Sequence, residues 1–233
     1  MKNIYNHFLL PLSLSLIIFS CNNKENSETI QKTIPLPEGV LYKLDMTAEN
    51  TEVNWTGYKT NEKIAVSGSF SEFSSDRENQ SFNSIDDLVD GLNFSINSLS
   101  SSSGDPAADV LVAIRDLNLK DYFFKYLTDN FKIEGTLGRP INDSIDVSFN
   151  ILGQDKTVRF AYSTYLTTSK YSNKIIQIKG KLDLVNQFNR EAFNSIHKQC
   201  FDLHKGKTWE EVDVDIKVLV INETNPKFHK IKH

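Results

Sequence analysis

The feature that most constrains this chain of 233 residues is an alternation of apolar and polar side chains that returns along most of its length. In TEVNWTGYKTNEKIAVSGSF, Val53, Trp55 and Gly57 alternate with polar neighbours, TNEK supplies a turn, and Ile64 to Phe70 alternates again. A period of two puts every second side chain on one face of a β-strand. The stretch therefore predicts a β-hairpin whose apolar face either packs into a filled core or faces a cavity.

The same period recurs in further segments, separated by turn-forming sequences such as GRPINDS and GQDK. Alternation with one polar face is typical of antiparallel sheets that are wet on one side. We therefore predict an all-β antiparallel barrel of about eight strands, with a two-sheet sandwich as the alternative. The candidate strands lie at 40–44, 53–57, 64–70, 92–96, 131–137, 145–151, 158–162, 176–184 and 212–220.

Two segments break the alternation and predict one or two short helices in the connections of the barrel. The first, 104–119, has Asp105 as a candidate N-cap and Pro106 in the first turn. The second, 186–206, has an apolar residue at every fourth position and Gly206 as a terminator. Its stripe consists of Phe188, Ala192, Ile196 and Cys200.

The N-terminus predicts an exported lipoprotein. Phe8 to Phe19 is an apolar run of about 12 residues, shorter than the ~20 needed to span a bilayer as a helix but suited to a secretory signal. It ends in Ile18-Phe19-Ser20-Cys21, which resembles a bacterial lipobox. A plain cleaved signal with an incidental cysteine is the alternative. We expect a lipid anchor on Cys21 and a periplasmic or surface-facing domain.

This interpretation divides the chain into a signal peptide at 1–20, a polar tether at 21–38, a barrel domain at 39–225 and a tail at 226–233. The net charge of -4 argues against a nucleic-acid partner, which would favour a basic patch. With Cys21 lipidated, Cys200 is the one remaining thiol, so no internal disulfide is expected.

The order of several short motifs, from about Leu41 to Val220, resembles the YceI-like family of polyisoprenoid-binding, lipocalin-like barrels, and the end of the chain is similar to the exported lipoprotein members of that family. The motifs are YKLD at 42–45, VNW at 53–55, GSFSEF at 68–73, RDLNL at 115–119 and FF at 123–124, with CFDLHKGKTWEEVDVDIKV at the end. The link from Gly104 to Arg115 is longer than usual in the family, and a middle-strand motif is reduced to ILGQDKTVRF.

The resemblance implies a lipocalin-like barrel with an elongated apolar interior that binds a polyisoprenoid, a quinone-like molecule or a fatty acyl derivative. Four glycines, Gly57, Gly68, Gly135 and Gly180, fall on the inferred dry faces. A glycine inside a strand either leaves room, here for a tunnel, or marks a bulge or a sharp corner. Both interpretations stand at this point.

Aromatic side chains on the dry faces are the candidate pocket wall, with ordinary core packing as the alternative for each. Arg115 and Asp116 are candidates for a rim contact with a polar head group such as a phosphate, or for a structural salt bridge or cap. The six candidate ligand-binding residues are Trp55, Phe70, Phe94, Phe131, Phe149 and Phe160.

Catalysis and metal binding have little support in the sequence. Cys200 and His204 are four residues apart, but a metal site needs three or four ligands, and Cys200 belongs to an apolar stripe. Nucleophile-elbow, Walker and HExxH motifs are absent. We expect neither an enzyme nor a cofactor or metal, and a hydrophobic small molecule as the partner. The competing hypothesis is a ligandless interaction module with a filled core.

Overall fold

The computed structural model describes residues 39–167 and 172–224, so the predicted signal peptide, tether and C-terminal tail lie outside the described residues. All nine predicted strands are present, and β4 and β6 are short additions that the alternation did not reveal. The strands are β1 (Tyr42–Asp45), β2 (Thr51–Lys59), β3 (Ile64–Phe70), β4 (Phe73–Ser75), β5 (Asn93–Asn97), β6 (Ser101–Ser102), β7 (Lys132–Leu137), β8 (Ser144–Ile151), β9 (Gln154–Leu166), β10 (Lys174–Asp183) and β11 (Glu211–Asn222).

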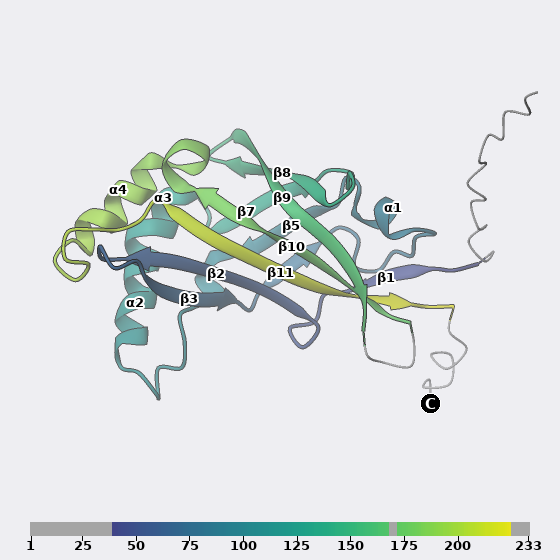
Figure 1. Ribbon diagram of the computed structural model, residues 1–233, viewed down its shortest axis with the longest axis horizontal. Helices are drawn as coiled ribbons and strands as arrows, with labels where there is room; N and C mark the ends of the chain where they lie inside the picture. The colour runs from purple at the N-terminus through teal and green to yellow at the C-terminus, as the bar shows by residue number, and fades with distance from the viewer. Residues whose placement is uncertain (1–38, 168–171, 225–233) are drawn as a thin grey trace, which may run out of the picture. The chain divides into compact units, whose positions relative to one another are not determined.

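The strands form one antiparallel sheet that closes on itself (Figure 1). Its hydrogen-bonded order is β4-β5-β7-β8-β9-β10-β11-β2-β3-β6, with β1 paired to β11 outside this path. β3 and β4 are halves of one strand bent at residues 71–72, and β5 and β6 are likewise joined by a 3-10 turn. Phe70 pairs with Ser101 and Phe73 with Ile96, so the two bent strands meet along both halves. The ten strands of the order therefore act as the eight of a barrel, as predicted.

The outer face of the barrel carries charged ladders, which explains the polar half of the alternation. On β11, Asp213 accepts from Lys181 at 3.1 Å, and Asp215 accepts from Lys179 at 3.0 Å. The hydroxyl of Tyr58 also donates to Asp213. Cross-strand pairs of opposite charge each stabilise a sheet modestly. The charged residues of β11 therefore point out of the barrel, and the valines that alternate with them point inward.

More helix is present than the sequence predicted, in four connections. The helical segments are α1 (Ile85–Val89), the 3-10 turn Ser98–Ser100, α2 (Leu111–Leu119), a π-helical turn at Lys120–Phe124, α3 (Lys125–Leu127), a second π-helical turn at Leu184–Phe188, and α4 (Arg190–Gln199). From α2 through the first π turn to α3 the chain is one continuous helical run. α2, α3 and α4 gather at one end of the barrel, and α1 lies towards the other (Figure 1). No helix of the described residues is long and apolar enough to cross a membrane.

The two predicted helices fared differently. The existence and the buried stripe of the second are confirmed: Asn189 caps α4, Ala192 is fully enclosed and Cys200 is 6% exposed. Its predicted end at Gly206 was wrong, because α4 ends at Gln199 and residues 200–206 form turns. The predicted start of the first at Asp105 was wrong, because α2 begins at Leu111. The Asp105 carboxylate accepts from the Ala107 N–H at 2.9 Å and closes a separate turn before the helix.

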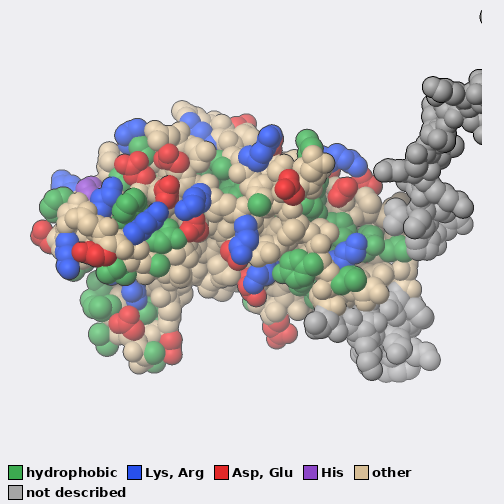
Figure 2. Space-filling view, viewed as in Figure 1, with side chains coloured by type: hydrophobic (Ala, Val, Ile, Leu, Met, Phe, Trp, Pro, Cys, Tyr) green, Lys and Arg blue, Asp and Glu red, His purple; other side chains and the backbone are tan. Residues whose placement is uncertain are grey.

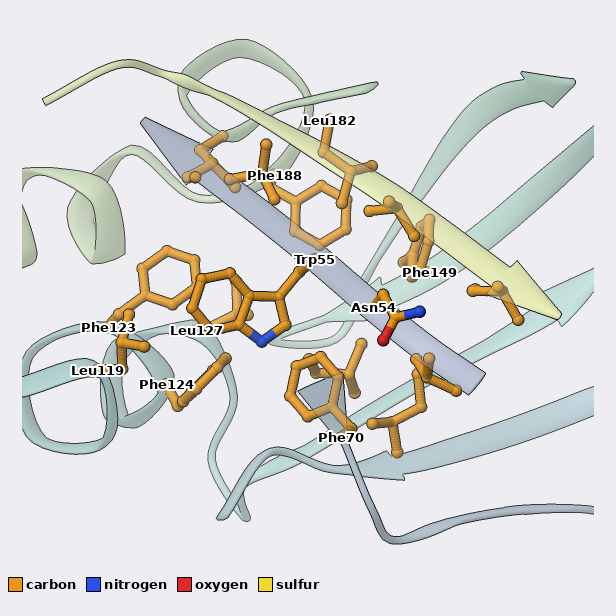
Figure 3. A pocket seen from close by; sticks show the side chains of 18 of the residues that line it. Asn54, Trp55, Phe70, Leu119, Phe123, Phe124, Leu127, Phe149, Leu182 and Phe188 are labelled. Carbon is orange, nitrogen blue, oxygen red and sulfur yellow. The ribbon is translucent and has the colours of Figure 1, made fainter. Parts of the chain in front are cut away.

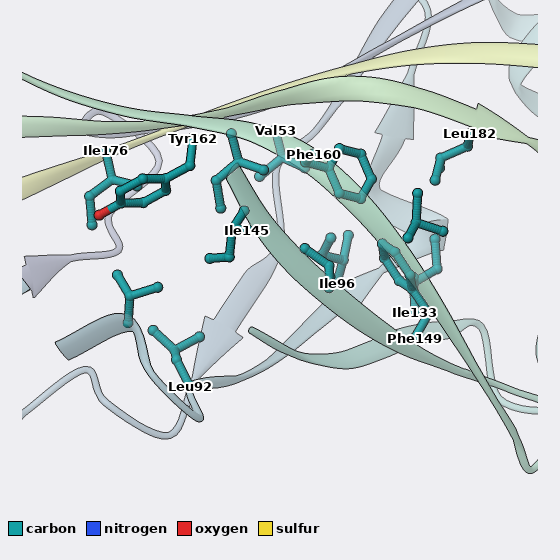
Figure 4. Packing of buried hydrophobic residues seen from close by; sticks show 14 of the residues in the cluster. Val53, Leu92, Ile96, Ile133, Ile145, Phe149, Phe160, Tyr162, Ile176 and Leu182 are labelled. Carbon is teal, nitrogen blue, oxygen red and sulfur yellow. The ribbon is translucent and has the colours of Figure 1, made fainter. Parts of the chain in front are cut away.

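The most tightly packed part of the interior lies on β8 and β9 and under α1 (Figure 4). Ile145 of β8 and Val158 of β9 are 1% and 3% exposed, and Leu88 of α1 is fully buried. Such burial stabilises by about 1.5–3 kcal/mol per large apolar side chain. Around these three residues, none of which lines a cavity, the interior is filled by the protein's own atoms.

Candidate functional site

The rest of the barrel interior is a cavity of about 550 Å³. Its lining is almost wholly apolar and comes from most strands and from the helical end of the barrel (Figure 3). The lining runs from Leu44, Val89 and Leu92 near α1 to Leu111 of α2 and Leu203 beyond α4. Small-molecule sites typically have cavities of about 300–1,000 Å³. The barrel can therefore hold one slender apolar ligand.

Five of the six aromatic residues predicted for the pocket wall line this cavity. Trp55 lies near the centre of its labelled lining, between Phe70 and Phe188 (Figure 3). The sixth, Phe131, is not in the lining and packs against the core instead. It precedes β7 with a φ of 59°, and its carbonyl accepts from Ser98, so it leaves the inward row that the alternation suggested. The five lining residues are Trp55, Phe70, Phe94, Phe149 and Phe160.

These rings interlock on one side of the cavity without closing it. The Phe149 ring packs edge-on against three others, with centroid distances of 4.9 Å to Phe188, 5.9 Å to Phe94 and 6.3 Å to Phe160. The Trp55 indole is held by a hydrogen bond of 3.1 Å from its N–H to Ser101 Oγ. Edge-to-face packing and a satisfied indole fix these rings in place. They form a rigid aromatic wall beside the cavity.

One of the four inward glycines leaves room in the cavity, as one of the two interpretations held, and the other three make space for aromatic rings. A Cβ on Gly68 would collide with the Trp55 indole, one on Gly135 would lie 2.7 Å from the Phe94 ring, and one on Gly180 would lie 2.6 Å from the Phe160 ring. These three glycines let aromatic rings lie flat against the neighbouring strand. At Gly57 no heavy atom of a non-adjacent described residue lies within 4 Å of that position. Gly57 alone of the four leaves room in the cavity.

The helical end contributes a lining that the predicted site omitted. Phe123 and Phe124 of the first π turn lie 5.3 Å apart, and Phe124 packs edge-on against Phe70 at 5.8 Å. π turns inside helices are frequent at functional sites. A signal existed in the sequence, because apolar residues recur at intervals of four at Leu119, Phe123 and Leu127. Those side chains close the barrel end as part of the cavity wall (Figure 3).

The rim of the cavity is apolar and exposed. Leu111, Ile114 and Leu203 line the cavity although they are 58%, 54% and 66% exposed. Hydrophobic side chains also gather on the surface over α2 (Figure 2). Because these residues belong both to the lining and to the surface, they mark the mouth of the cavity. The mouth also carries polar lining residues: Lys59, Arg115, Asn118, His204 and Thr208.

Arg115 and Asp116, the predicted rim residues, do not pair with each other. Arg115 lines the cavity, donates to Ser103 Oγ at 3.1 Å and pairs with Asp109 at 3.0 Å. Asp116 accepts from the Ser103 N–H at 2.9 Å and is not in the lining. Both side chains fasten the loop before α2. Arg115 alone also borders the cavity.

Cys200 and His204 lie together in the lining at the mouth. Burial raises the pKa of the Cys200 thiol. Burial, followed by the positive charges of Lys59 and His197, lowers the pKa of His204. His204 Nδ1 hydrogen-bonds Thr208 Oγ1 at 2.8 Å. Within residues 39–167 and 172–224, no group of three or more His, Cys, Asp or Glu side chains is placed to hold a metal ion.

No protein-family model matches the chain, and no curated protein matches it either. Solved structures do. A polyisoprenoid binding domain from Saccharophagus degradans, implicated in plant cell wall breakdown, superposes with a TM-score of 0.52 at 13% identity, over 78% of this chain and 98% of that one. BcnA of Burkholderia cenocepacia gives 0.49 at 14% identity, over 75% and 99%. A mutant of the Campylobacter jejuni YCEI protein gives 0.47 at 16% identity, over 66% and 83%. The antiparallel barrel predicted from the sequence is the fold that this chain shares with the Saccharophagus degradans domain.

Proposed function

We propose that the chain binds one hydrophobic chain inside its barrel and sequesters or carries it, with burial and no chemical step. The ligand class is a polyisoprenoid, a quinone-like molecule or a fatty acyl derivative. The observation that carries the proposal is the apolar cavity of about 550 Å³. Its support from outside the chain is the barrel of Saccharophagus degradans, which is named as a polyisoprenoid binding domain.

The energetics favour such a ligand. Burying about 400 Å² of an acyl or isoprenoid tail at ~25 cal/mol/Å² contributes roughly 10 kcal/mol. Loss of translational and rotational freedom offsets a large part of this, about 4 kcal/mol or more. The remainder of roughly 6 kcal/mol corresponds to a Kd of some tens of micromolar. Because the driving force is non-directional, a cavity with few polar groups is sufficient.

The competing hypothesis is a ligandless interaction module on the same scaffold. It requires an interior filled by side chains, as on β8 and β9. The open space at Gly57 and the half-buried valines of β11 argue against it. The carrier is therefore the better supported of the two.

Extraction of the purified protein with organic solvent, followed by mass spectrometry, tests the proposal. We expect a hydrophobic molecule in about one-to-one ratio with the chain. Uptake is followed independently by intrinsic fluorescence, because the two tryptophans of the chain, Trp55 and Trp209, both line the cavity. Absence of an extracted lipid, together with no response to prenyl or fatty acyl probes, would contradict the carrier.

We further propose that the chain is exported and held at a bacterial membrane by a lipid on Cys21, facing the periplasm or the outside. The support is the apolar run before Cys21 and the lipobox-like Ile18-Phe19-Ser20-Cys21. Two acyl chains anchor a protein stably. Cys21→Ala should abolish metabolic labelling with palmitate and move the protein out of the membrane fraction. Cys200→Ala is the matched control, and membrane association that survives Cys21→Ala would rule the anchor out.

A further inference from the structure

A lysine ends the inward row of β2, at the mouth of the cavity. Val53, Trp55 and Gly57 alternate along the strand and line the cavity, and Lys59 is the next residue of that row. Its backbone bridges to Thr208, beyond α4. Lys59 is half-buried and belongs to the lining itself. The apolar row thus terminates in an ammonium group.

Three lysines on the outer face of the barrel are each paired with an acid. Lys63 pairs with Glu211 at 2.9 Å, Lys181 with Asp213 at 3.1 Å, and Lys217 with Glu52 at 2.8 Å. For Lys59, no carboxylate of the described residues lies within 4.0 Å of the ammonium nitrogen. A partly desolvated cation without a counter-charge is unfavourable, and an anion beside it relieves that cost.

The groups around Lys59 suit an anion. Asp109, the acid whose pKa Lys59 helps to lower, is already paired with Arg115 at 3.0 Å. Arg115 supplies a second cation in the lining, and Thr208 supplies a hydroxyl bonded to His204. Charge-assisted hydrogen bonds from lysine and arginine are the usual means of holding a carboxylate or a phosphate.

We infer that the mouth is a head-group site, in which Lys59, assisted by Arg115, binds the carboxylate or phosphate of an amphiphile whose apolar tail lies in the barrel. The inference rests on the proposed carrier function and narrows its ligand class to anionic amphiphiles. The tail supplies most of the affinity by burial, and the head fixes which end enters first. Neutral chains of equal length enter the same cavity and bind more weakly.

Four probes and four forms of the full-length protein test this inference. The probes are palmitate and hexadecanol, and geranylgeranyl phosphate and geranylgeraniol, each titrated by tryptophan fluorescence. We expect each anion to bind the wild type about tenfold more tightly than its alcohol, which corresponds to ~1.4 kcal/mol. Lys59→Met should remove that advantage and leave the alcohols unchanged, and Lys59→Arg should preserve it. Lys198→Met, at an exposed lysine of α4 outside the lining, should match the wild type.

The outcomes separate the two proposals. Equal binding of anion and alcohol to the wild type would overturn the head-group site and leave the carrier intact. An equal loss of anion affinity in Lys59→Met and Lys198→Met would do the same, since it would indicate a diffuse charge effect. If none of the four chains binds, the carrier fails and the head-group site falls with it. A preference for only one of the two anions identifies the head as a carboxylate or as a phosphate.

Discussion

The β8–β9 part of the barrel wall and the β11 part are alike in sequence and different in packing. Inward residues of β8 and β9 such as Ile145 and Val158 are 1% and 3% exposed. Inward residues of β11 from Val212 to Val218 are half-buried, although they are equally apolar and alternate just as regularly. The difference lies in what stands opposite. Ile145 and Val158 lie outside the cavity lining, whereas Val212, Val214, Ile216 and Val218 belong to it. Alternation in the sequence predicts that a side chain points into the barrel, but it does not predict whether that side chain packs against another residue or faces a cavity.

The largest expected effect compares one substitution in both parts of the wall. Ile145→Ala should lower the free energy of unfolding by about 3 kcal/mol, because it leaves a new cavity among packed neighbours. Ile216→Ala should cost about 1 kcal/mol, because Ile216 already faces open space. Urea denaturation measures both. Equal losses would mean that the β11 part of the wall is packed as tightly as the β8–β9 part.

A matched pair of glycines gives the next largest effect. Gly180→Ala should cost about 2 kcal/mol, because its Cβ would lie 2.6 Å from the Phe160 ring and force that ring to shift. Gly57→Ala should leave the free energy of unfolding unchanged or raise it by up to about 1 kcal/mol, because Ala costs less conformational entropy. Thermal or urea unfolding distinguishes them. A loss at Gly57 as large as that at Gly180 would show that no room exists there.

The glycines also show which features of the fold and the cavity could be predicted from the sequence. Alternation predicted nine strands and five of the lining aromatics, because both follow from the period of a strand. It missed β4 and β6, which are three and two residues long and lie beyond bends at residues 71–72 and 98–100. It misplaced Phe131, whose positive φ breaks the period. The four glycines look identical in sequence, and only the positions of Trp55, Phe94 and Phe160 across the strands tell them apart.

Lys59 was missed for a different reason. Its place in the inward row was readable, since it follows Val53, Trp55 and Gly57 at intervals of two. A lysine beside a turn is nevertheless usually solvated, and TNEK follows directly. What distinguishes Lys59 from Lys63 is the presence or absence of a carboxylate partner, which depends on β11 some 150 residues away in sequence. Long-range pairing of this kind is outside the reach of local patterns.

A large side chain at Gly57 tests whether the cavity is the place where the ligand binds. Gly57→Phe should place a ring in the cavity with less than about 1 kcal/mol of change in the free energy of unfolding. The affinity for a prenyl or acyl probe should fall at least about tenfold, or ~1.4 kcal/mol, because less of the tail can be buried. Val66→Ala, a truncation in the lining opposite Gly57, is the control and should retain binding. Unchanged affinity in Gly57→Phe would place the ligand elsewhere.

The smallest expected effect concerns the pH dependence at the mouth. Burial and the charges of Lys59 and His197 lower the pKa of His204 in the folded chain. Below its unfolded pKa of about 6.5, the unfolded chain therefore binds a proton that the folded chain takes up only at lower pH. The free energy of unfolding should fall as the pH drops through 6.5, and stop falling below the folded pKa.

His204→Gln should reduce this dependence of the free energy of unfolding on pH, measured as urea midpoints at pH 7.5 and 5.0. Lys59→Met should reduce the pH dependence less, because burial contributes more than the charge of Lys59 to the lowered pKa of His204. Identical slopes in wild type and His204→Gln would show that the pKa of His204 is the same in the folded and the unfolded chain.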